Sequence, residues 1–201
     1  MSGRPPIALA WRGLAVLWLA AIVFPAWSAA LDGDIIVHVK KEGPEIVVDV
    51  DCPVRAPLSV VWAVLTDYDD MSRFISNLQQ SSVQSRAGNV LTVRQTGRAT
   101  RGPLSFSFDN VREVELHPFT EIRSRLVSGN LKASAFTTRI VDVASDGLVH
   151  VVNSGRYTPN LWVPPLIGPA LIEAETRKQF GEIRTEMLRR SGRPAAGPAA
   201  G

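Results

Sequence analysis

The sequence predicts an α+β domain in which an antiparallel sheet of about seven strands wraps on one long C-terminal helix, with two short helices after the early strands. Three patterns support this prediction. Apolar residues alternate at period two before residue 51 and through much of the middle of the chain. Residues 56–65 carry apolar side chains at helical spacing, and residues 169–190 carry a single apolar stripe. That helix must cover the apolar face of the sheet, because no other element is left to do so.

Residues 34–51 predict a β-hairpin. Apolar and polar side chains alternate on both sides of a Lys-Glu-Gly-Pro sequence at residues 41–44, which is typical of a turn. The single cysteine, Cys52, follows the second apolar run. No histidine or cation stands beside it in sequence to lower its pKa, so we expect it to be buried as a small hydrophobic residue.

Residues 56–65 predict a short helix, because their apolar side chains follow the i, i+3, i+4, i+7 spacing of one buried face. These side chains are Leu58, Val61, Trp62 and Leu65. A second short helix is expected at residues 69–74. We expect the neighbouring carboxylates of Asp67, Asp69 and Asp70 to cap these helices, with acid or base catalysis as the alternative role.

The middle of the chain, residues 78–152, has no helical stretch and is divided by turn signals. A sheet with one buried face is the expected result. The clearest strand has Leu104, Phe106 and Phe108 on one face and polar residues on the other. The other predicted strands cover residues 90–97, 121–127, 131–143 and 148–157.

A proline-rich linker, residues 158–168, precedes the long helix predicted from about residue 169 to residue 190. At about 1.5 Å per residue this helix would be roughly 33 Å long. The pairs Glu173 with Arg177 and Glu186 with Arg190 have the spacing of ion pairs on the solvent side. The inward stripe is Ile172, Thr176, Phe180, Ile183 and Met187. Residues 191–201 are mostly Gly, Pro and Ala, and we expect a disordered tail.

The N-terminus has the pattern of a cleaved signal peptide. Residues 1–30 contain Arg4 and Arg12 but no acid, then a short apolar run and small residues. We therefore expect a periplasmic or secreted protein, with an uncleaved N-terminal anchor as the alternative. Removing this segment leaves 20 basic and 19 acidic residues, a net charge of +1. Nucleic-acid binding is not expected from so balanced a chain.

The segments Val50-Asp51-Cys52-Pro53-Val54-Arg55-Ala56-Pro57 and Val61-Trp62-Ala63-Val64-Leu65-Thr66-Asp67-Tyr68-Asp69, followed by Phe74, resemble the opening of START-like (helix-grip) proteins of the polyketide cyclase and coenzyme Q-binding group. The Tyr157-Thr158-Pro159 segment, Trp162 and the long terminal helix resemble the ending of that group. The resemblance covers about residues 46–190, so residues 31–190 are expected to form a START-like ligand-binding domain. It implies a hydrophobic cavity between sheet and helix that binds a lipid, quinone or polyketide-like molecule.

Polar residues on the expected inner face are of interest. If alternation holds after Phe108, then Asn110 and Arg112 face the core, where an unpaired Arg is costly and would need a partner or a ligand headgroup. A β-bulge after Phe108 would instead turn them outward. The candidate ligand-binding residues are Trp62, Phe74, Phe106, Phe108, Asn110, Arg112, Phe136, Tyr157, Trp162, Phe180, Ile183 and Met187.

We favour a monomeric binder or carrier of a hydrophobic small molecule, with transient contact with a membrane surface. A cyclase or dehydratase acting through Asp67, Arg112 or His150 is one alternative. An envelope interaction protein with a filled core is the other. The three histidines are far apart and lack metal-ligand spacing, so no metal, cofactor or assigned catalytic residue is expected.

Overall fold

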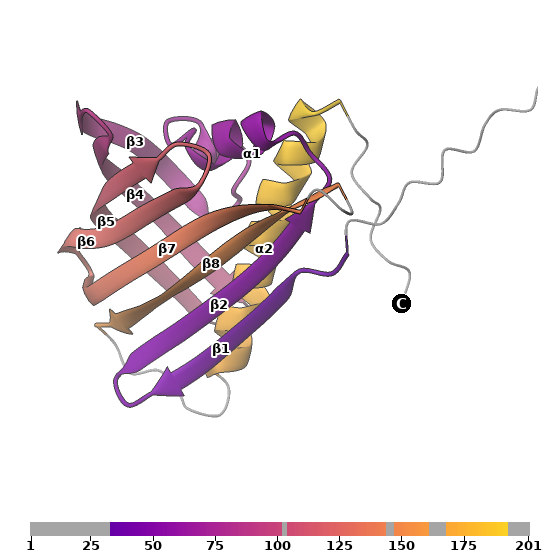
Figure 1. Ribbon diagram of the computed structural model, residues 1–201. Coiled ribbons are helices and arrows are strands. Elements are labelled where there is room, and N and C mark those ends of the chain that lie inside the picture. The colour runs from indigo at the N-terminus through magenta and orange to yellow at the C-terminus, as the bar shows by residue number, and fades with distance from the viewer. Residues whose placement is uncertain (1–32, 102–103, 144–146, 161–167, 193–201) are drawn as a thin grey trace, which may run out of the picture. The chain divides into compact units, whose positions relative to one another are not determined.

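The computed structural model describes residues 33–101, 104–143, 147–160 and 168–192, which belong to one compact unit. Eight strands form one sheet in the order β1-β2-β8-β7-β6-β5-β4-β3, and all neighbours are antiparallel (Figure 1). The strands are β1 Ile36–Glu42, β2 Glu45–Val54, β3 Leu78–Ala87, β4 Val90–Arg101, β5 Leu104–His117, β6 Glu121–Gly129, β7 Leu131–Val143 and β8 Leu148–Pro159. The helices are α1 Leu58–Leu65, a 3-10 turn η1 Met71–Arg73, and α2 Gly168–Arg190. The predicted fold class is confirmed.

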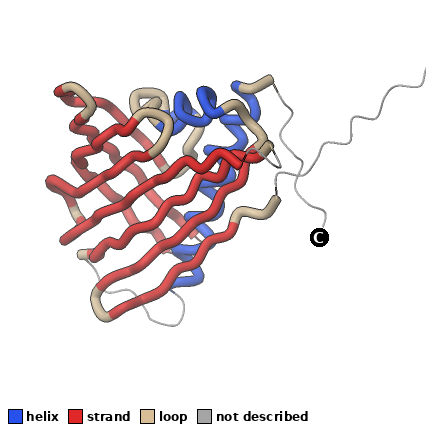
Figure 2. Tube along the Cα trace, in the orientation of Figure 1, coloured by secondary structure: helices blue, strands red, loops and turns tan. Residues whose placement is uncertain are grey.

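The predicted hairpin is β1 and β2, and β2 then pairs with β8 near the other end of the chain. Period-two alternation buries every second residue of β2 from Ile46 to Val54, including Cys52, as predicted. Gly43 in the turn has φ of 58°, a left-handed conformation that favours glycine. The β2–β8 pair therefore joins the early hairpin to the later strands in one continuous sheet, as the tube view in Figure 2 also shows.

One strand, β3, was not predicted. Its sequence, LQQSSVQSRA, is mostly polar, so it lacks the apolar alternation by which strands are found. The topology explains the composition, because β3 lies at the edge of the sheet and pairs only with β4. Most of its side chains are exposed, but Leu78 and Ser81 are buried.

The second predicted short helix is wrong: residues 69–74 contain only the 3-10 turn η1. Capping is also wrong, since neither α1 nor η1 has a side-chain cap. Instead, Asp69 Oδ1 accepts a hydrogen bond from the Val83 N–H on β3 (2.7 Å), and Asp70 pairs with Arg73 (3.1 Å). The Asp69 carboxylate therefore ties this loop to β3, whereas the Asp70 pair stays within the loop.

Helix α2 lies along one face of the sheet and contacts β1, β2 and α1 (Figure 1). The predicted pairs Glu173 with Arg177 (2.9 Å) and Glu186 with Arg190 (2.7 Å) are both formed. The solvent-side placement of Glu186 is wrong, because this residue is only 8% exposed. Helical spacing alone could not place it, since Glu186 stands beside the fully buried Met187 on the border of the apolar stripe.

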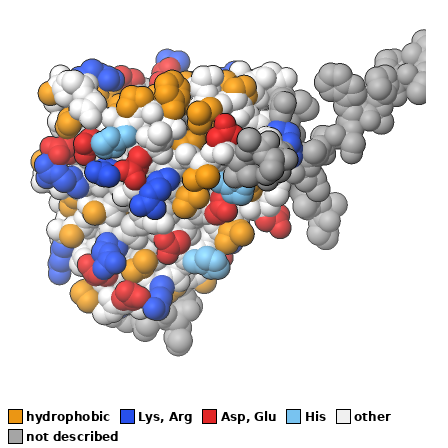
Figure 3. All heavy atoms as spheres, viewed as in Figure 1, with side chains coloured by type: hydrophobic (Ala, Val, Ile, Leu, Met, Phe, Trp, Pro, Cys, Tyr) orange, Lys and Arg blue, Asp and Glu red, His pale blue; other side chains and the backbone are white. Residues whose placement is uncertain are grey.

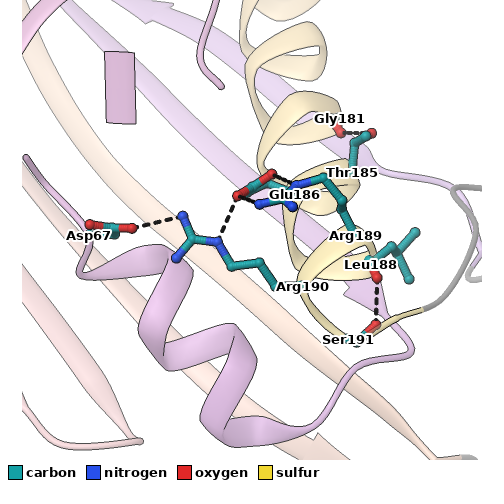
Figure 4. A network of polar contacts seen from close by, with 8 residues as sticks. All are labelled: Asp67, Gly181, Thr185, Glu186, Leu188, Arg189, Arg190 and Ser191. Atoms are coloured by element: carbon teal, nitrogen blue, oxygen red, sulfur yellow. Dashed lines mark hydrogen bonds and ion pairs between the residues drawn. The ribbon is translucent and has the colours of Figure 1, made fainter. Parts of the chain in front are cut away.

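Glu186 is the centre of a polar network at the C-terminal end of α2 (Figure 4). It accepts hydrogen bonds from Arg189 (2.6 and 2.7 Å) and Arg190 (2.7 Å), and Arg190 also pairs with Asp67 beyond α1 (2.7 Å). The Arg190 guanidinium lies over the Phe74 ring, 5.6 Å from its centroid. The hydrogen bonds from Arg189 and Arg190 lower the pKa of Glu186 to about 2. This network fastens the end of α2 to the loop between α1 and β3.

The face of the sheet turned away from α2 is polar and mixed in charge (Figure 3). Cross-strand ion pairs run over it, including Arg94 with Asp109 (2.7 Å) and Arg125 with Glu113 (2.7 Å). No helix in the described part of the chain has the length and apolar character to span a membrane. The predicted signal peptide (1–30), Trp162 and nearly all of the predicted tail (191–201) lie outside the described residues.

Candidate ligand-binding cavity

A cavity of about 770 Å³ lies between the inner face of the sheet and α2. Its wall is mainly apolar, and side chains from β2 to β8, from α1 and the loop after it, and from α2 contribute to it. On α2, the lining side chains follow one helical face from Leu171 to Ile183. Pro159, Asn160 and Gly168 also line it, so the connection between β8 and α2 starts and ends at the cavity. The space has the size of a small-molecule site.

Two phenylalanines of the wall lie directly across glycines of neighbouring strands. Phe108 on β5 pairs with Gly97 on β4, and Phe136 on β7 pairs with Gly155 on β8. A Cβ atom at either glycine would lie 2.4 Å from the facing ring, too close for any real contact. Because both positions are glycine, each ring can pack against the backbone of the neighbouring strand. The space above the two rings is then part of the cavity. Tyr157 then stacks near Phe136, with ring centroids 6.5 Å apart.

Arg112 on β5 faces the cavity, and so does Asn110. A register shift does occur nearby, because Val111 pairs with Ser128 whereas Arg112 pairs with Leu126. The additional residue, Val127, is therefore on β6, and alternation along β5 continues without a break. The alternative in which a bulge turns Asn110 and Arg112 outward is wrong.

The Arg112 guanidinium is held by a chain of buried polar side chains on three adjacent strands. It donates to Gln95 Oε1 on β4, while Gln95 Nε2 donates to Ser81 Oγ on β3 (3.0 Å). Because the Gln95 amide nitrogen is used on Ser81, its oxygen is directed at Arg112. Burial lowers the pKa of Arg112 below the usual arginine range, since the charged form has lost solvent.

Two tyrosine hydroxyls also belong to the wall. Burial raises the pKa of Tyr68, in the loop after α1, to about 12, and the nearby Arg112 charge offsets part of that rise. Burial likewise raises the pKa of Tyr157 on β8 to about 12. Both therefore stay protonated hydrogen-bond donors at neutral pH. Asn110 Oδ1 is buried without a hydrogen-bond partner within the described residues.

The predicted ligand-binding residues fall into three groups. Those that line the cavity are Phe108, Asn110, Arg112, Phe136, Tyr157, Phe180 and Ile183. Three lie elsewhere: Met187 is in the core, Phe74 lies under Arg190, and Trp62 contacts Phe119 with ring centroids 5.5 Å apart. The remaining two are Phe106, whose side chain is not described, and Trp162, outside the described residues.

Several polar wall residues escaped the sequence analysis. They include Tyr68, Gln95, Ser124, Thr138 and Asn153. Asn153 Nδ2 donates to Thr138 Oγ1 across β7 and β8 (2.7 Å). A signal for the strand residues was present, since Gln95 is in phase with the buried Val93 and Thr138 with the buried Ile140. A polar side chain in phase with the buried face of a strand is therefore the signal that could have identified these strand residues from the sequence.

The residues considered for catalysis do not converge. Asp67 is paired with Arg190, and His150 pairs through Nδ1 with Asp51 Oδ1 (2.8 Å) between the inward-facing Val149 and Val151. Of Asp67, Arg112 and His150, only Arg112 lines the cavity. Among the described residues, no group of three or more metal-ligating side chains gathers at one place.

Comparison with known proteins points to one family. The model of a family described as "Polyketide cyclase / dehydrase and lipid transport" matches residues 54–187, two thirds of the chain. No curated protein matches the sequence.

Solved structures resemble this fold at low sequence identity. A STAR-related lipid transfer protein from Xanthomonas axonopodis is 14% identical, with a TM-score of 0.61 over 79% of this chain and 96% of that one. The Zhui aromatase/cyclase from Streptomyces sp. R1128 is 15% identical, with a TM-score of 0.60 over 73% and 95%. A START superfamily protein from Mycobacterium smegmatis is 13% identical, with a TM-score of 0.60 over 72% and 98%. At these identities the likeness concerns the fold.

Proposed function

This chain belongs to the polyketide cyclase / dehydrase and lipid transport family, and from this premise we propose that it binds and carries a hydrophobic small molecule in the cavity between its sheet and α2. The observation that carries the proposal is the cavity itself. It has a volume of about 770 Å³ and a mainly apolar wall. A space of this size inside a domain is normally filled by side chains, because an empty space loses van der Waals contacts and lowers stability. A folded domain that keeps such a space gains from having an occupant.

The energetics favour an apolar occupant. Removing apolar surface from water contributes about 25 cal/mol per Å², and both the ligand and the wall would lose such surface. The phenylalanines over Gly97 and Gly155 and the α2 face from Leu171 to Ile183 supply that wall. The few polar groups are clustered, as expected where they orient a ligand rather than solvate it.

Two other functions have less support. A cyclase or dehydratase needs acid and base groups converging on the substrate. Of the three residues considered for that role, Asp67 pairs with Arg190 and His150 is hydrogen-bonded to Asp51, and neither lines the cavity. An envelope interaction protein with a filled core conflicts with the cavity. The large apolar side chains that are exposed among the described residues, Ile36, Phe119, Val127 and Val141, stand on four different segments.

Export of the protein is also part of the proposal, supported by the sequence of residues 1–30. A carrier outside the cytoplasm would move its ligand within the periplasm or beyond the cell. N-terminal sequencing of the protein from a periplasmic extract should find a chain that starts near residue 30. A chain that keeps residues 1–30 and sediments with membranes would instead support an uncleaved anchor.

Titration with the neutral dye Nile red tests the binding proposal. The wild-type protein is expected to raise the dye fluorescence saturably. Thr176→Trp, which fills the cavity from α2, should weaken binding by about tenfold or more, since tenfold corresponds to about 1.4 kcal/mol. The matched control is Thr185→Trp, the same change at an exposed position of the same helix. Equal dye binding by all three proteins, or none by the wild type, would contradict the proposal.

A further inference from the structure

Arg112 is a permanent cation in an apolar cavity, and no carboxylate neutralises it within the described residues. Its only hydrogen bond there is to a neutral group, Gln95 Oε1. A guanidinium has five N–H donors and stays protonated in proteins. A charge placed in this way is costly unless an anion completes the site.

The surroundings hold Arg112 in place but do not neutralise it. Ser81 and Gln95 are each less than one tenth exposed, and their hydrogen bonds fix the amide that receives the guanidinium. Tyr68 lines the same cavity as Arg112, and its hydroxyl forms no hydrogen bond with the described residues. Arg112 and Tyr68 thus supply one charged and one neutral donor to the wall of the same cavity.

The acids near the cavity do not fill this role. Glu175 on α2 lines the cavity, but its Oε1 accepts from Asn77 Nδ2 (3.1 Å) and it forms no ion pair with Arg112. The sequence between β8 and α2 at residues 161–167, Leu-Trp-Val-Pro-Pro-Leu-Ile, contains no acid. No acid of the described residues supplies an anion for Arg112, which favours a ligand that brings one.

We propose that the ligand is an amphiphile whose single carboxylate pairs with Arg112 and accepts a hydrogen bond from the Tyr68 hydroxyl, while its apolar body lies along the Phe108, Phe136 and α2 wall. This inference rests on the proposed function and names the class of ligand. A carboxylate suits the planar fork of an arginine, which can donate two parallel hydrogen bonds to it. One charge on the ligand matches the one cation and leaves the apolar wall for the remainder of the molecule.

Calorimetric titration with dodecanoate and with dodecanol, below the concentration at which either aggregates, tests this assignment. At about pH 8 the acid is ionised, and the two probes differ in the headgroup alone. The wild-type protein should bind dodecanoate at least about tenfold more tightly than dodecanol, as expected for hydrogen bonds to charged groups. Arg112→Met should remove this preference by weakening dodecanoate about tenfold to a hundredfold, with dodecanol changed by less than about threefold.

Two further variants keep the test decisive. Arg125→Met removes an arginine from the outer face, where it pairs with Glu113, and should keep the full preference for dodecanoate. Arg112→Lys keeps the charge without the fork and should show an intermediate preference, even if Arg112→Met folds poorly. Equal affinity of the wild type for both probes would overturn this inference and leave the proposed function intact. Failure of the wild type to bind dodecanol, dodecanoate and Nile red would overturn the proposed function itself.

Discussion

The C-terminal part of α2, residues 181–190, packs into the core through Ile183, Met187 and Leu188, whereas the preceding part, residues 168–180, has Gly168 as its only buried residue. The C-terminal part carries the buried Glu186 network, which reaches Asp67 through Arg190. The N-terminal part lines the cavity from Leu171 to Phe180. It forms few polar contacts with the rest of the domain, such as that between Glu175 and Asn77. One helix therefore has an anchored end and a covering end.

A continuous apolar stripe on a helix therefore does not require a continuous core beneath it. Five residues at helical spacing, from Ile172 to Met187, share one face, but only the last two reach buried surroundings. The anchored end is expected to determine stability, because its side chains fill space among other side chains. The covering end is expected to determine ligand binding.

The largest expected effect is on the free energy of unfolding, measured by urea denaturation. Met187→Ala removes a side chain with 0% exposure and should cost about 2 to 5 kcal/mol. Ile172→Ala, at the covering end, should cost less than about 1.5 kcal/mol, because its side chain already borders open space. Equal losses would mean that the two ends are packed alike.

The Glu186 network should make the anchored end sensitive to acid. Because folding lowers the pKa of Glu186 from 4.5 to about 2, its contribution is present above about pH 4.5 and is lost as the pH falls toward about 2. The loss is as much as about 3 kcal/mol by the linkage relation. Urea denaturation between about pH 6 and pH 2.5 should show a steeper decline for the wild type than for Glu186→Gln. Parallel declines in the free energy of unfolding of the two proteins would show that Glu186 does not cause the acid sensitivity.

Arg112, on the cavity side, should contribute less to stability than the residues of the anchored end. A cation without a counter-ion in the described structure is expected to add little stability, so Arg112→Met should leave the free energy of unfolding unchanged or raise it by up to about 1 kcal/mol. Thermal unfolding of the two proteins without ligand measures this. A loss comparable to that of Met187→Ala would make Arg112 a structural residue.

The smallest expected effect is on local opening of α2. Addition of Nile red should slow amide hydrogen exchange in residues 168–180, where the helix covers the cavity, by the equivalent of about 1 kcal/mol or less. Exchange of residues 184–190 through local opening should not change, since those residues pack in the core and not over the cavity, so the comparison is made at exchange times too short for global unfolding. Slowing spread evenly over α2 would contradict the division into two ends.

Much of the fold could be predicted because its elements show strong patterns. The hairpin, α1 and α2 each have apolar side chains at the period of their structure. The edge strand β3 could not be found in this way, because an edge exposes most of its side chains and selects polar residues. The helix predicted at residues 69–74 failed where Asp69, and Asp67 just before it, bind partners distant in sequence, Val83 and Arg190, which local rules do not include.

Part of the cavity wall could also be predicted, because its strand residues follow the period-two alternation. Alternation along β5 led to Asn110 and Arg112, since polar residues in phase with Phe108 stand out. Gln95 obeys the same alternation on β4 but was not singled out, and its importance comes from Ser81 on a strand that was not predicted. Trp62 and Phe74 are aromatic residues near the cavity that pack elsewhere, and composition cannot separate wall from core.

The most direct test of the carrier account is native mass spectrometry of the protein isolated from its own cells without detergent. The wild type is expected to carry an additional mass that denaturation releases as a small apolar molecule with one acidic group. Thr176→Trp, prepared in the same way, should lack that mass, and Thr185→Trp should retain it. A wild-type protein found only at the mass of its polypeptide, or a ligand retained equally in Thr176→Trp, would contradict the account.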